Sequence, residues 1–384
     1  MPDFPGTIDS KLPRVGTTIF TVMSQLAAEH QAINLSQGFP DFGCDPELAE
    51  LVYQHIQAGH NQYAPMAGLP LRVAVADKVL GLYATRYDPE HEITITAGAT
   101  QALFTAVLAV VRPGDEVIVF EPAYDSYVPA IELAGGTAVY TRLQVPGYTV
   151  DWDEVARLIT PRTRMIMINT PNNPTGSVWS AEDMQALAQL TAGSNIVIVS
   201  DEVYEHILFD GRTHQSAARF PELAARSFIV SSFGKTYHVT GWKVGYCLGP
   251  RNLMAEFRKV HQFNVFTVNT PVQHALAAFM QQPEHHLGLA GFYQAKRDFF
   301  IEQLNGSRFS LRPSAGTYFQ LLGYADISGE ADRDLAVRWT RELGVASIPV
   351  SVFYHRPEDH KVLRFCFAKS AETLTKAAEI LRRI

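Results

Sequence analysis

The chain has 384 residues, with 39 acidic and 32 basic side chains and a formal net charge of -7. This length fits roughly two domains with a substantial core. We find no run of lysine or arginine that could follow a phosphate backbone, so nucleic acid and anionic membranes are poor candidates as partners. None of the 13 histidines falls into an HExxH-type spacing, and no metal site is expected.

The N-terminal stretch MPDFPGTIDSKLP carries acids and prolines where a signal peptide needs an apolar segment. The longest clearly apolar run, ALFTAVLAVV at 102–111, is about half a membrane span. The three cysteines, Cys44, Cys247 and Cys366, lie far apart and form no CxxC or zinc spacing, which fits a reducing compartment. We therefore expect a cytoplasmic protein.

Residues 1–45 show no regular alternation, whereas strand-like and helical runs alternate from about residue 46. A helical stretch, QALFTAVLAVV, follows the strand-like run EITIT. Near-continuous Val/Ile runs are typical of parallel strands that helices cover on both faces. We therefore predict a large α/β domain over 46–290, with a mainly parallel sheet sandwiched by helices. Its expected strands are EITIT, VIVF, MIMIN, NIVIVS and FIVSS.

The pattern changes after about residue 290. The apolar runs TYFQLLGY, VASIPVSVF and VLRFCFA precede an amphipathic helix that starts near Ala371. This order predicts a smaller α+β domain. We assign residues 291–384 to it, together with residues 1–45.

Polar residues follow five of the predicted strands, in ITAGAT, FEPAYD, NTPNNPTG, SDEVYE and SSFGKT. The carboxyl ends of parallel strands line the ligand crevice of an open sheet, so these residues are expected to form one site. The GKT of the last segment is not a phosphate-binding P-loop, because Ile229 occupies the position that needs a glycine. Lys235 is instead a candidate nucleophile.

An ordered series of motifs covers nearly the whole chain: NLSQGFPDF, NQYAP, TPNNPTG, SDEVYE, SSFGKTYHVTGWKVG and RFCFAK. This series resembles the fold type I pyridoxal-phosphate enzymes, specifically the methionine and kynurenine aminotransferase branch of class I. The resemblance implies that Lys235 forms the Schiff base with pyridoxal 5'-phosphate and later moves the α-proton of the substrate.

The resemblance also assigns the residues around the cofactor ring. Asp201 would face the pyridine nitrogen and keep it protonated, Tyr204 and Asn173 would donate to the ring oxygen, and Tyr124 would stack on the ring. Three of these residues have a structural alternative: Asp201 a helix cap, Asn173 a turn beside Pro174, and Tyr124 a place in the core.

The phosphate of the cofactor needs donors and a positive charge. Ala99 and Thr100 precede a helical stretch whose first amides can receive an anion. By resemblance, Ser232 and Lys243 complete the cup, although many relatives carry arginine where Lys243 stands, which replaces a bidentate fork by a point charge. The resemblance further implies a homodimer with shared active sites, in which Tyr63 of the partner subunit contacts the phosphate.

Arg364 lies in an apolar strand, where an unpaired guanidinium would be costly to bury. By resemblance it grips the α-carboxylate of the substrate, beside Gly38 and Asn173; a structural salt bridge is the alternative. Dicarboxylate-specific relatives place a second arginine in the region that corresponds to 261–275, which has none here. Phe266 lies there instead, and Phe20 matches an aromatic wall of the substrate pocket, unless these rings only fill the core.

These residues predict an aminotransferase that moves the amino group of methionine and other large neutral or aromatic amino acids to a 2-oxo acid in two steps. A cysteine-conjugate β-lyase shares the first steps and is one alternative. A ligand-binding protein on the same scaffold is another, disfavoured because Lys235, Asp201, Asn173, Tyr204 and Arg364 are all present.

Overall fold

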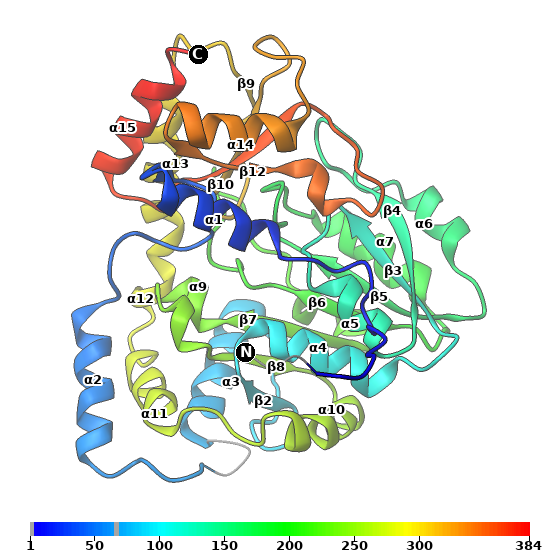
Figure 1. Cartoon of the computed structure of the whole chain (residues 1–384). Helices are drawn as coiled ribbons and strands as arrows, with labels where there is room; N and C mark the ends of the chain where they lie inside the picture. The colour runs from blue at the N-terminus through cyan, green and yellow to red at the C-terminus, as the bar shows by residue number, and fades with distance from the viewer. Residues whose placement is uncertain (1–3, 65–68) are drawn as a thin grey trace.

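The computed structural model describes residues 4–64 and 69–384 and has a seven-stranded sheet at its centre (Figure 1). The strand order is β2-β8-β7-β6-β5-β3-β4, and β8 runs antiparallel to both of its neighbours. The pairs from β7 to β4 are parallel, which confirms the predicted α/β class with a mainly parallel sheet. The strands are β2 (Ile93–Thr96), β3 (Glu116–Glu121), β4 (Thr137–Arg142), β5 (Thr163–Asn169), β6 (Val197–Asp201), β7 (Ser227–Ser232) and β8 (Gly245–Leu248).

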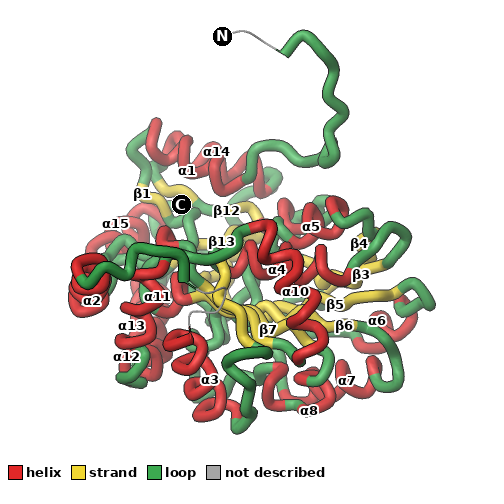
Figure 2. Tube along the Cα trace, turned by 90° about the horizontal axis from the view of Figure 1, so that it is seen from below, coloured by secondary structure: helices red, strands yellow, loops and turns green. Residues whose placement is uncertain are grey.

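Alternate residues of these strands point to two different cores. Val117 and Val119 pack with α4, α5 and α10, whereas Ile118 and Phe120 pack on the other face with α3, α6, α7, α8 and α11. Figure 2 shows α4, α5 and α10 on one side of the sheet and α3, α7 and α8 on the other. These helices are α3 (Leu69–Tyr83), α4 (Ala99–Val110), α5 (Tyr127–Leu133), α6 (Trp152–Leu158), α7 (Ala181–Thr191), α8 (Pro221–Ala224), α10 (Arg251–Asn264) and α11 (Thr270–Phe279).

A separate core joins the two ends of the chain. Met23 and Leu26 of α1 pack with apolar residues of the C-terminal helices and strands. Two small sheets belong to this region, one with the order β12-β13-β10-β9 and one in which β1 pairs with β11. The elements are α1 (Ile19–Glu29), β1 (Ile33–Asn34), α13 (Leu289–Gln303), β9 (Ser310–Leu311), β10 (Phe319–Gly323), α14 (Asp332–Glu342), β11 (Val345–Ala346), β12 (Ile348–Pro349), β13 (Val362–Cys366) and α15 (Ala371–Leu381).

The domain boundaries at residues 46 and 290 stay a prediction, because Tyr204, Ile207 and Phe209 also pack into the second core. The described residues also form the α-helices α2 (Pro46–Gln57), α9 (Phe233–Thr236) and α12 (Glu284–Leu287) and the 3-10 helices η1 (Ala217–Arg219), η2 (Thr240–Trp242) and η3 (Val350–Phe353). Figure 2 shows the segment before α1 projecting from the body. No helix in the described part of the chain is both long and apolar enough to cross a membrane.

Candidate active site

A cavity of about 150 Å³ lies at the carboxyl ends of the parallel strands. Nine of the residues predicted from sequence line it: Ala99, Thr100, Tyr124, Asn173, Asp201, Tyr204, Ser232, Lys235 and Lys243. A wider depression elsewhere, lined by His91, Arg251, Asn252, Ala255 and Arg258, contains none of the predicted residues. The strands end at one edge of the sheet, so residues far apart in sequence converge there as predicted.

Asp201 is the last residue of β6 and is 4% exposed. Its carboxylate accepts a hydrogen bond of 2.6 Å from the Tyr127 hydroxyl and one of 3.3 Å from the Val203 amide. Both donors are neutral. Burial raises the pKa of Asp201 to about 6 against the opposing effect of these hydrogen bonds. The carboxylate therefore lies in a place that favours a cationic neighbour.

Lys235 lies in α9, the short helix that follows β7. Its Nζ donates to the carbonyl of Gly38 at 3.0 Å and lies 5.7 and 5.6 Å from the ring centres of Tyr204 and Tyr318. Burial lowers the pKa of Lys235 to about 8, and the positive charges of Arg364 and Lys243 lower it further. A fraction of this amine is therefore neutral, the form that a nucleophile or base requires.

The N-terminus of α4 lies close to the side chain of Lys243. Gly98 caps the helix with φ +79, and a Cβ built there would lie 3.4 Å from Lys243 Nζ. The first amides of an α-helix have no acceptor within the helix, so Ala99 and Thr100 bring donors to the same place. Ser232 caps α9, where its Oγ accepts from the Gly234 amide at 3.2 Å. These groups form a cradle suited to an anion.

Arg364 of β13 is fully buried, yet its partners are neutral. It donates to Asn173 Oδ1 at 2.6 Å and to the Ser36 carbonyl at 2.8 Å, and within the described ranges its Nε has no partner. Burial lowers the pKa of Arg364 to about 10. The guanidinium also lies 3.9 Å from the ring centre of Phe319 and 5.3 Å from that of Phe20. The predicted alternative, a structural salt bridge, is absent among the described residues.

Gly38 and Phe20 lie near these charges. The Gly38 carbonyl accepts from Lys235 and from the Tyr318 hydroxyl, and a Cβ on Gly38 would lie 2.8 Å from the Phe319 ring. The Phe20 ring lies 6.0 Å from that of Phe353. The end of the site at Arg364 therefore combines one guanidinium with several aromatic rings.

Five predicted residues are not part of the cavity lining: Gly38, Phe20 and Arg364, described above, and Tyr63 and Phe266. Tyr63 is 80% exposed and Phe266 is 45% exposed, and their rings contact each other edge to face at 5.4 Å. A single chain does not bring them to the cofactor residues, so their assigned roles stay predictions. Conversely, Tyr127, Tyr318 and Ser36 contact the site residues but were not predicted from sequence. Tyr127 stands in EPAYDSY, only three residues beyond Tyr124, and resembles an ordinary core aromatic.

Comparisons with known proteins identify the family of the chain. The family model for aminotransferase class I and II matches residues 30–381. The methionine aminotransferase of Escherichia coli (strain K12) is 52% identical over 377 residues, which cover 98% of each chain. Kynurenine–oxoglutarate transaminase 1 of Rattus norvegicus is 34% identical over 411 residues, which cover 97% of each chain. The crystal structure of Escherichia coli YbdL, whose reactivity identified a methionine aminotransferase function, superimposes with a TM-score of 0.97 at 52% identity, covering 99% of this chain and 100% of that chain. The chain therefore belongs to the class I and II aminotransferases.

Proposed function

We propose that this protein is a pyridoxal-phosphate-dependent aminotransferase for methionine and other large neutral or aromatic amino acids, with a 2-oxo acid as acceptor. The observation that carries the proposal is the position of a buried amine, Lys235, in one site with the unpaired charges of Asp201 and Arg364. The names of the relatives, methionine aminotransferase and kynurenine–oxoglutarate transaminase, support it.

The donor set fits pyridoxal phosphate. Ala99, Thr100, Ser232 and Lys243 would hold the phosphate at the start of α4, where Gly98 leaves room for it. Asp201 would keep a proton on the ring nitrogen. The remaining ring contacts would come from Asn173 Nδ2, the Tyr204 hydroxyl and the face of Tyr124. When bound, the cofactor supplies an aldehyde that accepts amines and a ring that withdraws electrons.

The chain's own residues would then perform three tasks. Lys235 Nζ takes and returns the α-proton, since its lowered pKa leaves part of the amine neutral. Arg364 binds the α-carboxylate of the substrate, with which a guanidinium forms two parallel hydrogen bonds. Asn173 already contacts Arg364 at 2.6 Å and would orient it.

The substrate preference follows from the rings beside Arg364. Phe20, Phe319 and Phe353 surround the guanidinium, and residues 261–275 contain no arginine. An apolar wall penalises a second carboxylate or an ammonium far more than it distinguishes neutral side chains. Methionine is favoured because its flexible thioether packs well on aromatic rings.

A homodimer with shared sites is part of the proposal. Tyr63, Phe263 and Phe266 are exposed aromatic residues, and the segment before α1 also exposes Phe4 and Ile8. A second copy of the chain would cover such a surface and would place Tyr63 of the partner subunit near the phosphate. Light scattering should therefore report a dimer, and a fully active monomer would contradict this part of the proposal.

The proposed location is the cytoplasm. Cys44, Cys247 and Cys366 are all free thiols, and two of them are buried. A protein that keeps three cysteines unpaired fits a reducing compartment. Cell fractionation with an antibody to the chain tests this location.

A panel of amino acids tests the function. The holoenzyme is mixed with each amino acid in turn, and conversion of the cofactor to its amine form gives a specificity constant. Methionine, phenylalanine, tyrosine and leucine should exceed aspartate and lysine. A constant for aspartate above those of both methionine and phenylalanine would overturn the preference. Pyruvate and ammonia formed from one amino acid alone would instead identify a β-lyase.

A further inference from the structure

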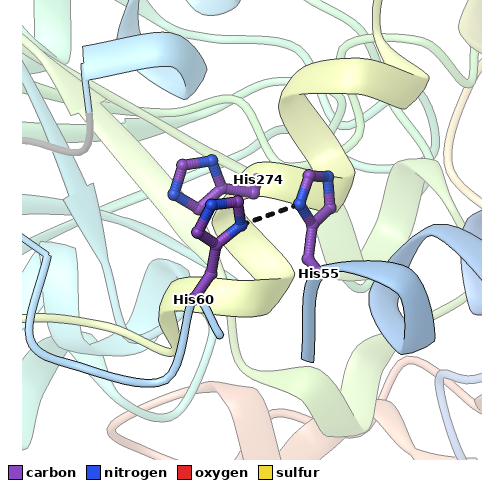
Figure 3. A group of neighbouring side chains, drawn as sticks. All are labelled: His55, His60 and His274. Carbon is purple, nitrogen blue, oxygen red and sulfur yellow. Dashed lines mark hydrogen bonds between the residues drawn. The ribbon is translucent and has the colours of Figure 1, made fainter. Parts of the chain in front are cut away.

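Three histidines, none of which lines the cofactor cavity, lie close to one another. His55 lies in the last turn of α2, His60 lies in the loop that follows, and His274 lies in α11 (Figure 3). One ring nitrogen from each lies within 4.8 Å of the others, and all three side chains are partly buried. His55 Nδ1 and His60 Nδ1 are 2.9 Å apart. Spacing along the chain does not reveal this group, because His274 belongs to a distant helix.

The geometry is close to that of a metal site. Zinc binds imidazole nitrogen at about 2.0–2.1 Å with tetrahedral angles, so its ligand atoms lie roughly 3.4 Å from one another. The observed separations, 2.9 Å for one pair and at most 4.8 Å for the others, bracket this value. His60 stacks on His274 with ring centres 4.1 Å apart, so one ring must turn to aim its nitrogen at a common point. Partly buried side chains leave room for that rotation.

We propose that His55, His60 and His274 bind one divalent transition-metal ion of the zinc or nickel type, with solvent in the remaining coordination position. The ligand set selects this class, because imidazole suits zinc, copper and nickel, whereas calcium and magnesium prefer oxygen. This inference is independent of the proposed function. It replaces the expectation from histidine spacing that no metal site exists.

The ion would fasten the loop after α2 to α11. Two hydrogen bonds already connect these segments, since Thr270 Oγ accepts from the Ala64 amide at 3.1 Å and donates to the Gln62 carbonyl at 2.7 Å. A metal held by His60 and His274 adds a third connection next to Tyr63. Its role is therefore structural, and bound metal should raise the melting temperature of the protein.

Calorimetric titration of the holoenzyme with zinc chloride tests the proposal. The protein must carry no histidine tag and is first dialysed against a chelator. We expect one ion per chain, a rise in melting temperature that EDTA reverses, and no change in the visible absorption of the bound cofactor. A change in that absorption coupled to binding would place the metal at the cofactor and overturn the proposal.

Substitutions locate the ion. His60→Gln and His274→Gln should each weaken binding at least about tenfold, whereas His91→Gln, which removes an exposed histidine paired only with Asp88 in the described structure, should leave it unchanged. Cobalt adds a second readout, because its spectrum separates nitrogen ligands from the partly exposed thiol of Cys44. Circular dichroism and cofactor absorption establish that each variant is folded, and His60 lies in a loop, where substitution disturbs packing least. Absence of stoichiometric binding, or wild-type affinity in both cluster variants, would overturn the proposal.

Discussion

Two groups of buried charges differ in their partners. Behind the sheet, Lys78 Nζ lies 2.7 Å from Glu205 Oε1, and Tyr83, Ser231 and Tyr246 also donate to that carboxylate. Burial alone would raise the pKa of Glu205, but Lys78, His206 and these hydrogen bonds hold it well below its usual value. This group balances its own charge within the fold.

The charged residues of the candidate site form no such ion pair among the described residues. Asp201 has only neutral donors, Lys235 donates to a carbonyl, and Arg364 donates to an amide oxygen and a carbonyl. Burial shifts all three pKa values towards the neutral form. A buried charge with a charged partner belongs to the structure, whereas one with neutral partners is poised for a charged ligand. Substitutions in the two groups should therefore affect different properties.

The largest expected effect is the loss of turnover in Lys235→Ala. Removal of a positioned base costs up to about 10⁴-fold, and this residue is also the proposed attachment point of the cofactor. The variant should still bind pyridoxal phosphate, and single-turnover kinetics with methionine measure the loss. Lys259→Ala, at an exposed lysine paired with Glu256, is the control and should be fully active. Near-normal turnover of Lys235→Ala would end the assignment of this residue.

Lys78→Met should affect stability instead. It leaves the Glu205 carboxylate, 2% exposed, without its cation, and breaking a buried pair in this way costs about 3–5 kcal/mol. The free energy of unfolding in urea measures this loss, while the kcat of the folded enzyme should stay near the wild-type value. Lys376→Met, at an exposed pair with Glu372, should change neither quantity. A large fall in kcat with unchanged stability would remove the distinction between the two groups.

Asp201→Asn should stabilise the cofactor-free protein. The folded-state pKa of about 6 lies above the ordinary value of 3.8, so the folded state binds this proton more tightly than the unfolded state. Stability is therefore lost as pH rises from about 4 to about 6, and it stays lower above that range. The asparagine side chain of the variant does not ionise and so avoids this loss of folding stability, which is up to about 3 kcal/mol.

Urea unfolding of both cofactor-free proteins at pH 7.5 and pH 4 gives the comparison. The gain in Asp201→Asn should be present at pH 7.5 and nearly absent at pH 4. With the cofactor bound, Asp201→Asn should be less stable than the wild type, because the wild-type carboxylate then has a cationic partner. A variant less stable than wild type at pH 7.5 without cofactor would mean that the Asp201 charge is already balanced.

Arg364→Lys keeps the positive charge but loses the planar guanidinium, which can form two parallel hydrogen bonds with a carboxylate. Hydrogen bonds between charged groups contribute about 1.5–3 kcal/mol, so kcat/KM for methionine should fall roughly 10- to 100-fold. Methionine amide lacks the carboxylate and should be an equally poor substrate for both enzymes. Arg338→Lys, at an exposed ion pair with Glu330, serves as control. Equal losses for methionine and its amide would show that Arg364 acts only through folding.

The sequence predicted the parts of the fold that are fully buried. The strands β2, β3, β5, β6 and β7 coincide with the predicted strand-like runs, which are rich in Val and Ile because both faces of these strands are covered. The edge strand β4 and the short antiparallel β8 were not predicted. Side chains of β4 are largely exposed or half-buried, which weakens the apolar pattern, and β8 has the sequence GYCL, which lacks the Val/Ile residues of the predicted strands.

The site was predictable where a polar residue directly follows a strand or carries a family motif, as at Asp201, Lys235 and Arg364. It was not predictable where the partner is an aromatic residue that also suits a core. Tyr127 and Tyr318 are 3% and 0% exposed, and only the folded chain shows that their hydroxyls reach Asp201 and Gly38. Tyr63 and Phe266 depend on what covers them in a second copy, so they stay predictions.

The smallest expected effect concerns one of these overlooked tyrosines. Tyr127→Phe removes the 2.6 Å hydrogen bond to Asp201 Oδ2 and leaves the packing of the ring intact. The loss of one hydrogen bond costs about 0.5–1.5 kcal/mol, so the affinity for pyridoxal phosphate should fall roughly 2- to 10-fold. That hydrogen bond also lowers the pKa of Asp201, so in the variant this pKa should rise and the decline of cofactor affinity in acid should begin at a higher pH.

Tyr87→Phe is the matched control for this substitution. Tyr87 is 4% exposed, like Tyr127 a buried ring, but its hydroxyl has no hydrogen-bond partner in the described part of the structure. Tyr87→Phe should therefore leave the affinity for pyridoxal phosphate and the pH profile of this affinity unchanged. Equilibrium titration of each cofactor-free variant with pyridoxal phosphate between pH 5 and pH 8 measures both quantities. If Tyr127→Phe behaves as Tyr87→Phe does, the neutral donor contributes nothing to Asp201, and the contrast between the two groups of charges rests on burial alone.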